Sequence, residues 1–399
     1  MSIMFQPIQI GAVTLKNRFV HSATHEVMAA DDGRVTDLLI KRYRNLAKGE
    51  VGLIIPGHMF VHPLGNAHRR QIGIHTDAMI PGLKCLAGTV HENGSKIAFQ
   101  LAHGGRQAPK QLIGTKPLAP SNQGRDPVTM NKPQQMTEEM IEETIEAFAS
   151  AAGRAAKAGA DAVQIHAAHG FLVNEFLSPF FNKRRDKWGG SDENRFRFLS
   201  EIIKRIKARA PGDMAVLVKM NTIDYTPLKG ITPQLAAVYA KWLTEIGVDA
   251  IELSCGTYYT FKGLRGDIPV PEMAAGVPLW MRPVAYVKLN YQKRGNTFAH
   301  AYNLEAAKRI KPEMGDTPLI LVGGMRKLAQ MAEIVESGHA DLVSMSRPFI
   351  REPFLVKRFR QNKTSEAACI SCNKCFAAMF NEIPIKCYVV GLPGFKPKK

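Results

Sequence analysis

Two closely spaced histidines, followed by a polar stretch, are the first candidates for a functional site. The mostly apolar run 162–165 is typical of a buried strand, and His166 and His169 follow at its end. If strands and helices alternate into a barrel, the carboxyl end of a strand is where side chains meet a ligand. Two histidines at this spacing, taken alone, more often lie in a core or on the surface than in a functional site. The polar stretch 174–195 that follows is too elaborate for a simple connection, so we favour a functional site.

Four of the six cysteines crowd into the last part of the chain. They are spaced C-x2-C-x2-C-x11-C, as Cys369, Cys372, Cys375 and Cys387. Such crowding in an intracellular chain indicates metal ligation rather than disulfides. The spacing suits an iron-sulfur cluster, and a structural zinc site is the alternative, because four thiolates can bind either.

Strand and helix patterns alternate along the chain. Eight strand candidates lie at 19–23, 51–56, 96–101, 161–166, 215–220, 249–254, 319–322 and 341–346. Helical patterns fill the gaps at 37–47, 78–92, 138–158, 193–209, 233–245, 304–310, 328–337 and 352–360. This alternation predicts an α/β fold, a parallel (β/α)8 TIM barrel, rather than an open sheet. The Gly-x-Gly-x-x-Gly turn of a dinucleotide fold is missing, and an alternating stretch around Gly11 predicts a hairpin before the first strand.

Composition indicates a globular protein of one main domain. The 399 residues are 45% hydrophobic and 22% charged, and we expect a barrel over 1–362 followed by a short extension over 363–399. There is no apolar stretch near 18 residues and no secretion signal, so we expect a cytoplasmic protein without a membrane span. The net charge of +18 is scattered, apart from the tail 395–399. It favours a solvated surface over nucleic-acid binding, and it would also attract an acidic redox partner.

Polar residues gather at the carboxyl ends of the predicted strands. In chain order these ends supply Ser22, Ala23, Thr24, His25, Gly57, His58, Gln100, His103, His166, His169, Lys219, Asn221, Ser254, Gly323, Gly324, Ser346 and Arg347. Glutamine can pair with an amide edge, lysine can stabilise negative charge, and paired glycines beside an arginine suit a phosphate. The long segments 104–136 and 256–302 should overhang the same mouth. We therefore expect a site for a polar ring system that carries an anion.

Several phrases resemble the Old Yellow Enzyme family of flavin mononucleotide (FMN) oxidoreductases. They are LKNRFV, QLAHGGR, HAAHGF, FLSPFFNKRRDKWGGSDENRFRF and LVGG, and the likeness covers residues 5–360. The resemblance implies a barrel that binds FMN through Ser22, Ala23, Thr24, His25, Gly57, Gln100, Lys219, Gly323, Gly324, Ser346 and Arg347. It also implies that His166 and His169 bind a substrate carbonyl, with Lys219 beside the flavin as the third catalytic residue.

Three positions depart from the family pattern. Phe171 stands where many relatives have a proton-donating tyrosine, and Ser346 stands where glycine is more usual. His25 replaces the usual threonine or cysteine, which resembles the dienoyl-CoA reductase branch. The CISCNKC segment is similar to that of 2,4-dienoyl-CoA reductase and trimethylamine dehydrogenase, which implies a [4Fe-4S] cluster held by the four cysteines.

The expected function is reduction of an activated C=C bond in a small-molecule alkene, an enone or enoyl thioester. NADH, NADPH or a reduced electron-transfer protein would supply the electrons, the cluster would relay them, and we expect a homo-oligomer. The alternative is an amine or C-H dehydrogenase that passes electrons through the cluster to an acidic carrier. It would need an aromatic cage, for which Tyr258, Tyr259 and Trp280 are candidates. A non-catalytic electron carrier is a third reading.

Overall fold

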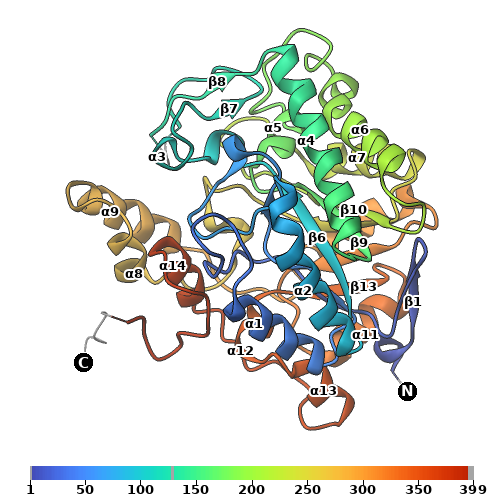
Figure 1. The fold of residues 1–399 in the computed structure, drawn as a ribbon. Helices are drawn as coiled ribbons and strands as arrows, with labels where there is room; N and C mark the ends of the chain where they lie inside the picture. The colour runs from blue at the N-terminus through green and yellow to red at the C-terminus, as the bar shows by residue number, and fades with distance from the viewer. Residues whose placement is uncertain (1, 127–129, 394–399) are drawn as a thin grey trace.

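A computed structural model of the chain describes residues 2–126 and 130–393, so the basic tail 395–399 lies outside it (Figure 1). Eight parallel strands form its centre: β3 (Phe19–His21), β4 (Leu53–Ile54), β6 (Lys96–Ala102), β9 (Ala162–Ala167), β10 (Ala215–Asn221), β11 (Ala250–Ser254), β12 (Leu319–Val322) and β13 (Leu342–Met345). Strand β4 pairs with both β3 and β6, which closes the ring, and the short β5 (Met59–Phe60) adds to β6. The predicted TIM barrel is confirmed.

The predicted helices surround this barrel. They are α1 (Asp37–Lys48), α2 (Ile80–Glu92), α4 (Glu138–Lys157), α6 (Asp192–Arg209), α7 (Pro233–Glu245), α10 (Leu304–Ile310), α11 (Leu328–Glu336) and α13 (Leu355–Arg360). The last prediction, 352–360, began too early, because a separate short α12 (Arg347–Arg351) comes first and Pro353 stands before α13. Short 3-10 turns lie at η1 (Ile3–Phe5), η2 (Pro63–Gly65), η3 (Asp77–Met79) and η7 (Lys311–Met314).

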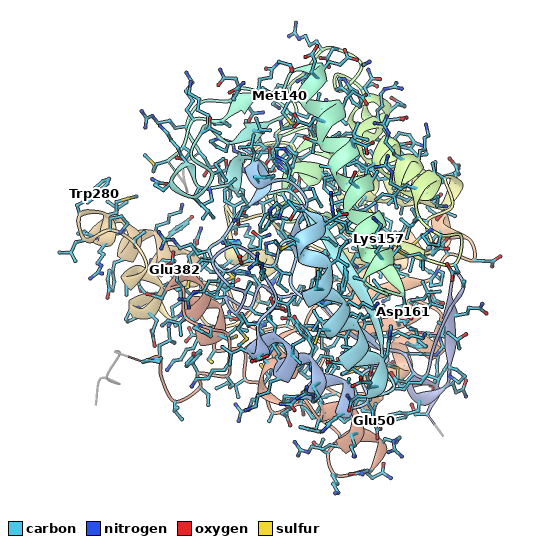
Figure 2. The ribbon with its side chains drawn as sticks, viewed as in Figure 1. Glu50, Met140, Lys157, Asp161, Trp280 and Glu382 are labelled. Carbon is cyan, nitrogen blue, oxygen red and sulfur yellow. The ribbon has the colours of Figure 1, made fainter. Side chains whose placement is uncertain are left out.

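Helix α4 illustrates why these segments are helical and how they pack. The Thr137 hydroxyl accepts a hydrogen bond from the Met140 amide at 3.3 Å, and acidic residues in the first turn complement the helix dipole. The buried Ile141, Ile145 and Phe148 recur at helical spacing on one face. Figure 2 labels Met140 and Lys157 towards the two ends of this helix.

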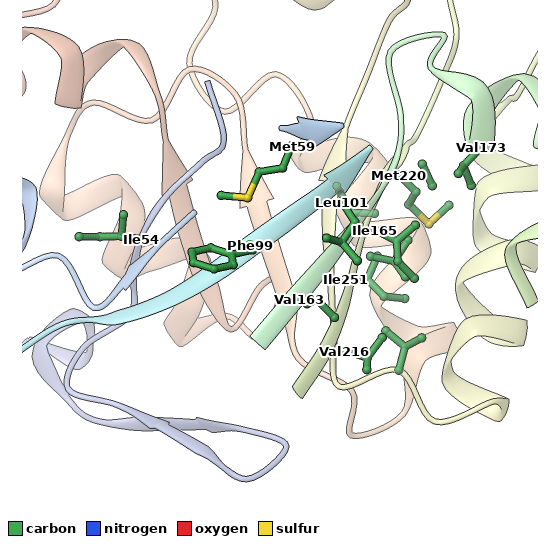
Figure 3. Close-up of a cluster of buried hydrophobic side chains, with 14 of the residues drawn as sticks. Ile54, Met59, Phe99, Leu101, Val163, Ile165, Val173, Val216, Met220 and Ile251 are labelled. Atoms are coloured by element: carbon green, nitrogen blue, oxygen red, sulfur yellow. The ribbon is translucent and has the colours of Figure 1, made fainter. Parts of the chain in front are cut away.

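The main core lies between the barrel and its helices. Side chains alternate along each strand, so that Phe99, Val163 and Ile251 join the helices in one buried cluster (Figure 3). The opposite faces of the same strands point into the barrel, where Ala98, Ala162 and other residues form a separate cluster. Each strand therefore packs one face against the helices and turns the other face into the barrel interior, where the site lies.

A small hairpin closes the amino-terminal end of the barrel, as the pattern around Gly11 predicted. Strands β1 (Ile8–Ile10) and β2 (Val13–Leu15) are antiparallel. Ile10, Val13 and Leu15 are buried in the same cluster as the interior residues of the strands. The ligand site is therefore restricted to the other end.

Both predicted overhanging segments contain structure of their own. The first carries η4 (Gly105–Gln107), α3 (Lys110–Ile113), β7 (Leu118–Ala119) and β8 (Gln134–Gln135). The second carries η5 (Phe261–Gly263), α8 (Val270–Ala275), η6 (Leu279–Met281) and α9 (Arg282–Lys293), and a further helix, α5 (Leu172–Leu177), follows β9.

The carboxyl-terminal extension packs against the second overhanging segment. Its helix α14 (Lys374–Phe380) shares a small core with α8, formed by Ile268, Val270, Met273, Ala377, Ala378, Tyr388 and Leu392. Figure 1 shows α8, α9 and α14 together at one side of the barrel. Among the helices that the structure describes, none is long and apolar enough to cross a bilayer.

We predict that the β1–β2 hairpin, which plugs the amino-terminal end of the barrel, contributes strongly to the free energy of unfolding. Leu15→Ala removes a fully buried side chain and should lower the free energy of unfolding by about 2 to 5 kcal/mol. Leu38→Ala, at a position that is 56% exposed, is the control and should change it little. Urea unfolding of both variants measures the difference, and equal midpoints would contradict the role of the plug.

Candidate active site

A buried polar layer crosses the interior of the barrel, and Glu252 is its centre. The Glu252 carboxylate accepts hydrogen bonds from Ser22 at 2.7 Å, Ser344 at 2.7 Å and Gln164 at 2.9 Å. The Lys219 ammonium lies 3.2 Å from the same carboxylate and donates to the Ser22 hydroxyl at 2.7 Å. Burial alone would raise the pKa of Glu252, but the charge of Lys219 and these hydrogen bonds outweigh it and lower the pKa. The layer therefore holds a carboxylate paired with a cation.

The predicted ring-binding residues stand around this layer. Gln100 donates to Gln164 at 2.6 Å, which leaves the Gln100 carbonyl oxygen as an acceptor for a ligand. Gln100 and Lys219 line a cavity of about 360 Å³ at the barrel mouth, together with Ser22, Ala23, Thr24 and His25. This wall offers hydrogen-bond donors and acceptors to a planar polar ring.

His166 and His169 face the same cavity with their rings 5.2 Å apart. A hydrogen bond of 2.7 Å joins His169 Nε2 to the Ser254 hydroxyl, and the His169 amide donates to Asn221 at 3.3 Å. His166 Nδ1 is buried without a partner among the described residues. Burial lowers the pKa of His169 to about 3 and that of His166 well below its usual value. Both rings are therefore neutral at pH 7 and carry one N–H each; His169 can donate from Nδ1 to a ligand when Ser254 donates to its Nε2.

Three further histidines extend the pair along the cavity. The rings of His25 and His68 stack at 4.7 Å, and His58 lies 5.6 Å from His68. Phe171 fills the space between His58 and His166, at 4.9 and 4.5 Å. Burial lowers the pKa of His68 to about 4, and the pKa values of His25 and His58 fall well below normal. His68 was missed because it lies in a loop without a periodic pattern.

The far end of the cavity suits an anion. Gly323 and Gly324 have φ values of 122° and 72°, and a Cβ at Gly324 would lie 2.2 Å from the Ala299 carbonyl oxygen. This backbone therefore requires glycine. Arg347 and Arg326 line the cavity here, although Arg326 was not predicted. The Ser346 hydroxyl lies 2.6 Å from that of Thr24, which links the anion end to the ring end.

Two of the residues named from the sequence do not line the cavity. The Gly57 amide donates to the Glu26 carboxylate at 2.8 Å and to the Tyr43 hydroxyl at 3.2 Å, so Gly57 does not line the cavity. Trp280 is 77% exposed on η6 and is also absent from the lining, so it cannot complete an aromatic cage (Figure 2).

The four cysteines of the extension converge. Cys369, Cys372, Cys375 and Cys387 line one small cavity of about 20 Å³, which Arg347 also lines. Within residues 2–126 and 130–393, no three His, Cys, Asp or Glu side chains are arranged to hold a single metal ion. The cysteine cavity and the large cavity thus share Arg347 as part of their walls.

Comparison with known proteins places this geometry in a family. The model of the NADH:flavin oxidoreductase / NADH oxidase family matches residues 3–267 and 273–366. NADPH dehydrogenase of Bacillus subtilis (strain 168) is 35% identical over 370 residues, which are 91% of this chain and 96% of that protein.

Two solved structures extend the likeness to the cysteine region. A structure of 2-naphthoyl-CoA reductase has a TM-score of 0.85 at 26% identity, and one of histamine dehydrogenase from Rhizobium sp. 4-9 has a TM-score of 0.81 at 23% identity. Each match covers 97% of this chain but only 56% and 52% of those chains, so this chain spans about half their length. The family match and the Bacillus relative show that this chain belongs to the NADH:flavin oxidoreductase / NADH oxidase family of flavin-dependent oxidoreductases, which confirms the resemblance to Old Yellow Enzyme.

Proposed function

We propose that this protein is an FMN-dependent ene-reductase that reduces the activated C=C bond of an enone or enoyl thioester. The observation that carries the proposal is the neutral histidine pair, which faces the same cavity as Lys219. NADH, NADPH or a reduced electron-transfer protein would provide electrons. The expected cytoplasmic location, the homo-oligomer and the lack of nucleic-acid binding stay predictions.

The residues of the cavity fit FMN. The backbone at 22–24, Gln100 and Lys219 would hold the ring, and Gly323, Gly324, Ser346, Arg347 and the additional Arg326 would surround the phosphate. When bound, FMN would supply the hydride. Because Lys219 is paired with Glu252, the ring would meet a cation whose charge is partly balanced.

The histidines would position the substrate and stabilise its charge. His166 and His169 would donate hydrogen bonds to the carbonyl oxygen, where negative charge develops as hydride adds to the β carbon. Neutral rings suit this role because they donate without losing a proton. The 2-naphthoyl-CoA reductase neighbour, named for an acyl-CoA thioester, supports a thioester carbonyl as one option.

Water is the proton source that we favour for the α carbon. Phe171 has no exchangeable proton, and the hydroxyl groups of Tyr258 and Tyr259 both donate to Asp126. Burial raises the pKa of Tyr258 well above 10 and that of Tyr259 to about 12, so neither readily releases a proton.

We further propose a [4Fe-4S] cluster on Cys369, Cys372, Cys375 and Cys387 that relays electrons. A single zinc ion needs its four sulfurs about 2.3 Å from one point. A four-iron cluster spreads its ligands over four metal atoms. The C-x2-C-x2-C-x11-C spacing and the resemblance of the CISCNKC segment favour the cluster over zinc, and the four cysteines line one small cavity.

The amine dehydrogenase alternative has less support. Histamine dehydrogenase, at 23% identity, shares the fold alone. The proposed cage of Tyr258, Tyr259 and Trp280 does not form, because Trp280 lies outside the cavity.

We predict that the histidine pair binds a phenolate as it would an enolate oxygen. A para-substituted phenol should give a long-wavelength charge-transfer band on the oxidised flavin, and the double change His166→Ala and His169→Ala should abolish it. His91→Ala, remote from the cavity and half-exposed, is the control. A band that survives the double change places the substrate anchor elsewhere.

The buried ion pair predicts two opposite shifts in flavin potential. Lys219→Met removes the cation and should lower the potential, whereas Glu252→Gln leaves Lys219 unbalanced and should raise it. A change of about 1.4 to 3 kcal/mol corresponds to roughly 30 to 65 mV for two electrons. Spectroscopic redox titration measures both variants, and shifts of the same sign would contradict the arrangement.

Iron analysis tests the cysteine assignment. Anaerobically purified protein should contain about four irons and four sulfides. Cys372→Ala should lose them, whereas Cys85→Ala, at an exposed cysteine of the barrel, should retain them. Zinc in place of iron in the parent protein would rule out the cluster.

A further inference from the structure

Two arginines at the anion end of the large cavity also bind the cysteine loop, which we define as residues 369–375. Arg347 Nη1 donates to Asn373 Oδ1 at 2.5 Å and to the Arg265 carbonyl at 2.7 Å. Arg326 Nη2 donates to the Ser371 hydroxyl at 2.6 Å. Ser371 and Asn373 stand on either side of Cys372. The wall of one cavity is therefore tied to the loop that forms the other.

The Asn373 side chain is fixed by its contacts. Its residue is 1% exposed, and its Nδ2 donates to the Asp267 carbonyl at 2.7 Å and to the Leu264 carbonyl at 3.3 Å. With the amino group on these two carbonyls, the amide oxygen must point to Arg347. Asn373 thus joins the overhanging segment, the cysteine loop and the arginine at one point.

The backbone of the cysteine loop requires support. Ser371 and Asn373 have φ values of 53° and 55°, in the left-handed region that costs free energy for residues other than glycine. A ligand held by the cysteines would oppose relaxation of this loop. Without that ligand, only the Asp267 and Leu264 carbonyls would hold the Asn373 amide against Arg347, so we expect this contact to be weaker.

Arg347 keeps free donors for an anion. Its Nη1 is used by Asn373 and Arg265, whereas its Nε and Nη2 have no partner in the part of the chain that the structure describes. Because one edge of the guanidinium is held by protein, the other edge has a set direction. Phosphate recognition by arginine depends on such geometry.

We propose that Asn373 is a positioning residue that couples FMN affinity to the loading of the cysteine site, through Arg347. The inference rests on the proposed function, since it takes FMN in the large cavity and a cluster on the cysteines. Linkage requires the coupling to be reciprocal, so bound FMN also stabilises the loaded cysteine site.

The test compares FMN with riboflavin, which lacks the phosphate. Flavin-free protein is prepared anaerobically with its iron and, in a matched sample, after iron removal by a chelator. Fluorescence quenching gives each dissociation constant. FMN should bind about tenfold more weakly to the iron-free sample, as expected for one hydrogen bond to a charged group, and riboflavin should bind both alike.

Two variants separate positioning from loop stability. Asn373→Ala should weaken FMN binding about tenfold in the iron-loaded sample, leave riboflavin unaffected and shift the ³¹P NMR signal of bound FMN. The control is Asn296→Ala, because Asn296 donates to the Leu264 and Gly266 carbonyls of the same segment but not to Arg347. It should keep both the FMN affinity and its dependence on iron.

Three results would overturn the coupling: equal FMN affinity with and without iron, equal losses for FMN and riboflavin in Asn373→Ala, or a parent protein that never holds iron. The measured iron content distinguishes the failures. Absent iron rejects the proposed cluster, whereas iron with unchanged FMN affinity rejects the coupling alone.

Discussion

The buried pair of Glu252 and Lys219 is the interaction on which the site depends. Removing two charges from water costs several kcal/mol per ion, and only close, fully hydrogen-bonded geometry repays it. Glu252 meets that condition through groups on β9, β10 and β13 and through Ser22, just after β3. Loss of either partner would leave an uncompensated charge, at about 3 to 5 kcal/mol. The pair therefore fixes how these strands meet inside the barrel.

The same register places the chemistry. Residues two apart on a strand point to the same face. His166 therefore shares a face with Gln164, and Ser254, the hydrogen-bond partner of His169, shares a face with Glu252. A slip of one residue would turn these groups into the apolar core. At the anion end, the cysteine loop positions the site rather than the barrel strands. Its Ser371 and Asn373 side chains hold Arg326 and Arg347 by hydrogen bonds. The polar layer and the cysteine loop thus position opposite ends of one cavity.

The sequence predicted the barrel because its strands are apolar runs and its helices carry strong periodic faces. It also placed His166, His169 and Lys219 at the mouth, since the carboxyl ends of parallel strands must meet there. Glu252 and Gln164 were missed, although each stands two residues before a residue that we predicted at a strand end, Ser254 and His166. That spacing was a usable signal, because residues two apart on a strand share a face. His68 and Arg326 lie outside the strands, where no periodicity locates them. The position of Gly57 outside the cavity lining could not be predicted, because only the fold shows its amide bound to Glu26.

We propose that reduced flavin in the cavity would deliver hydride to an alkene, rather than oxidised flavin removing hydride from an amine. The direct measurement is anaerobic stopped-flow absorbance with the flavin reduced stoichiometrically and then mixed with a panel of enones and enoyl thioesters. We predict that at least one of these compounds restores the oxidised flavin spectrum and is recovered with its C=C bond saturated. If none of them reoxidises the flavin, while an amine bleaches the oxidised protein, the proposed direction of hydride transfer is contradicted.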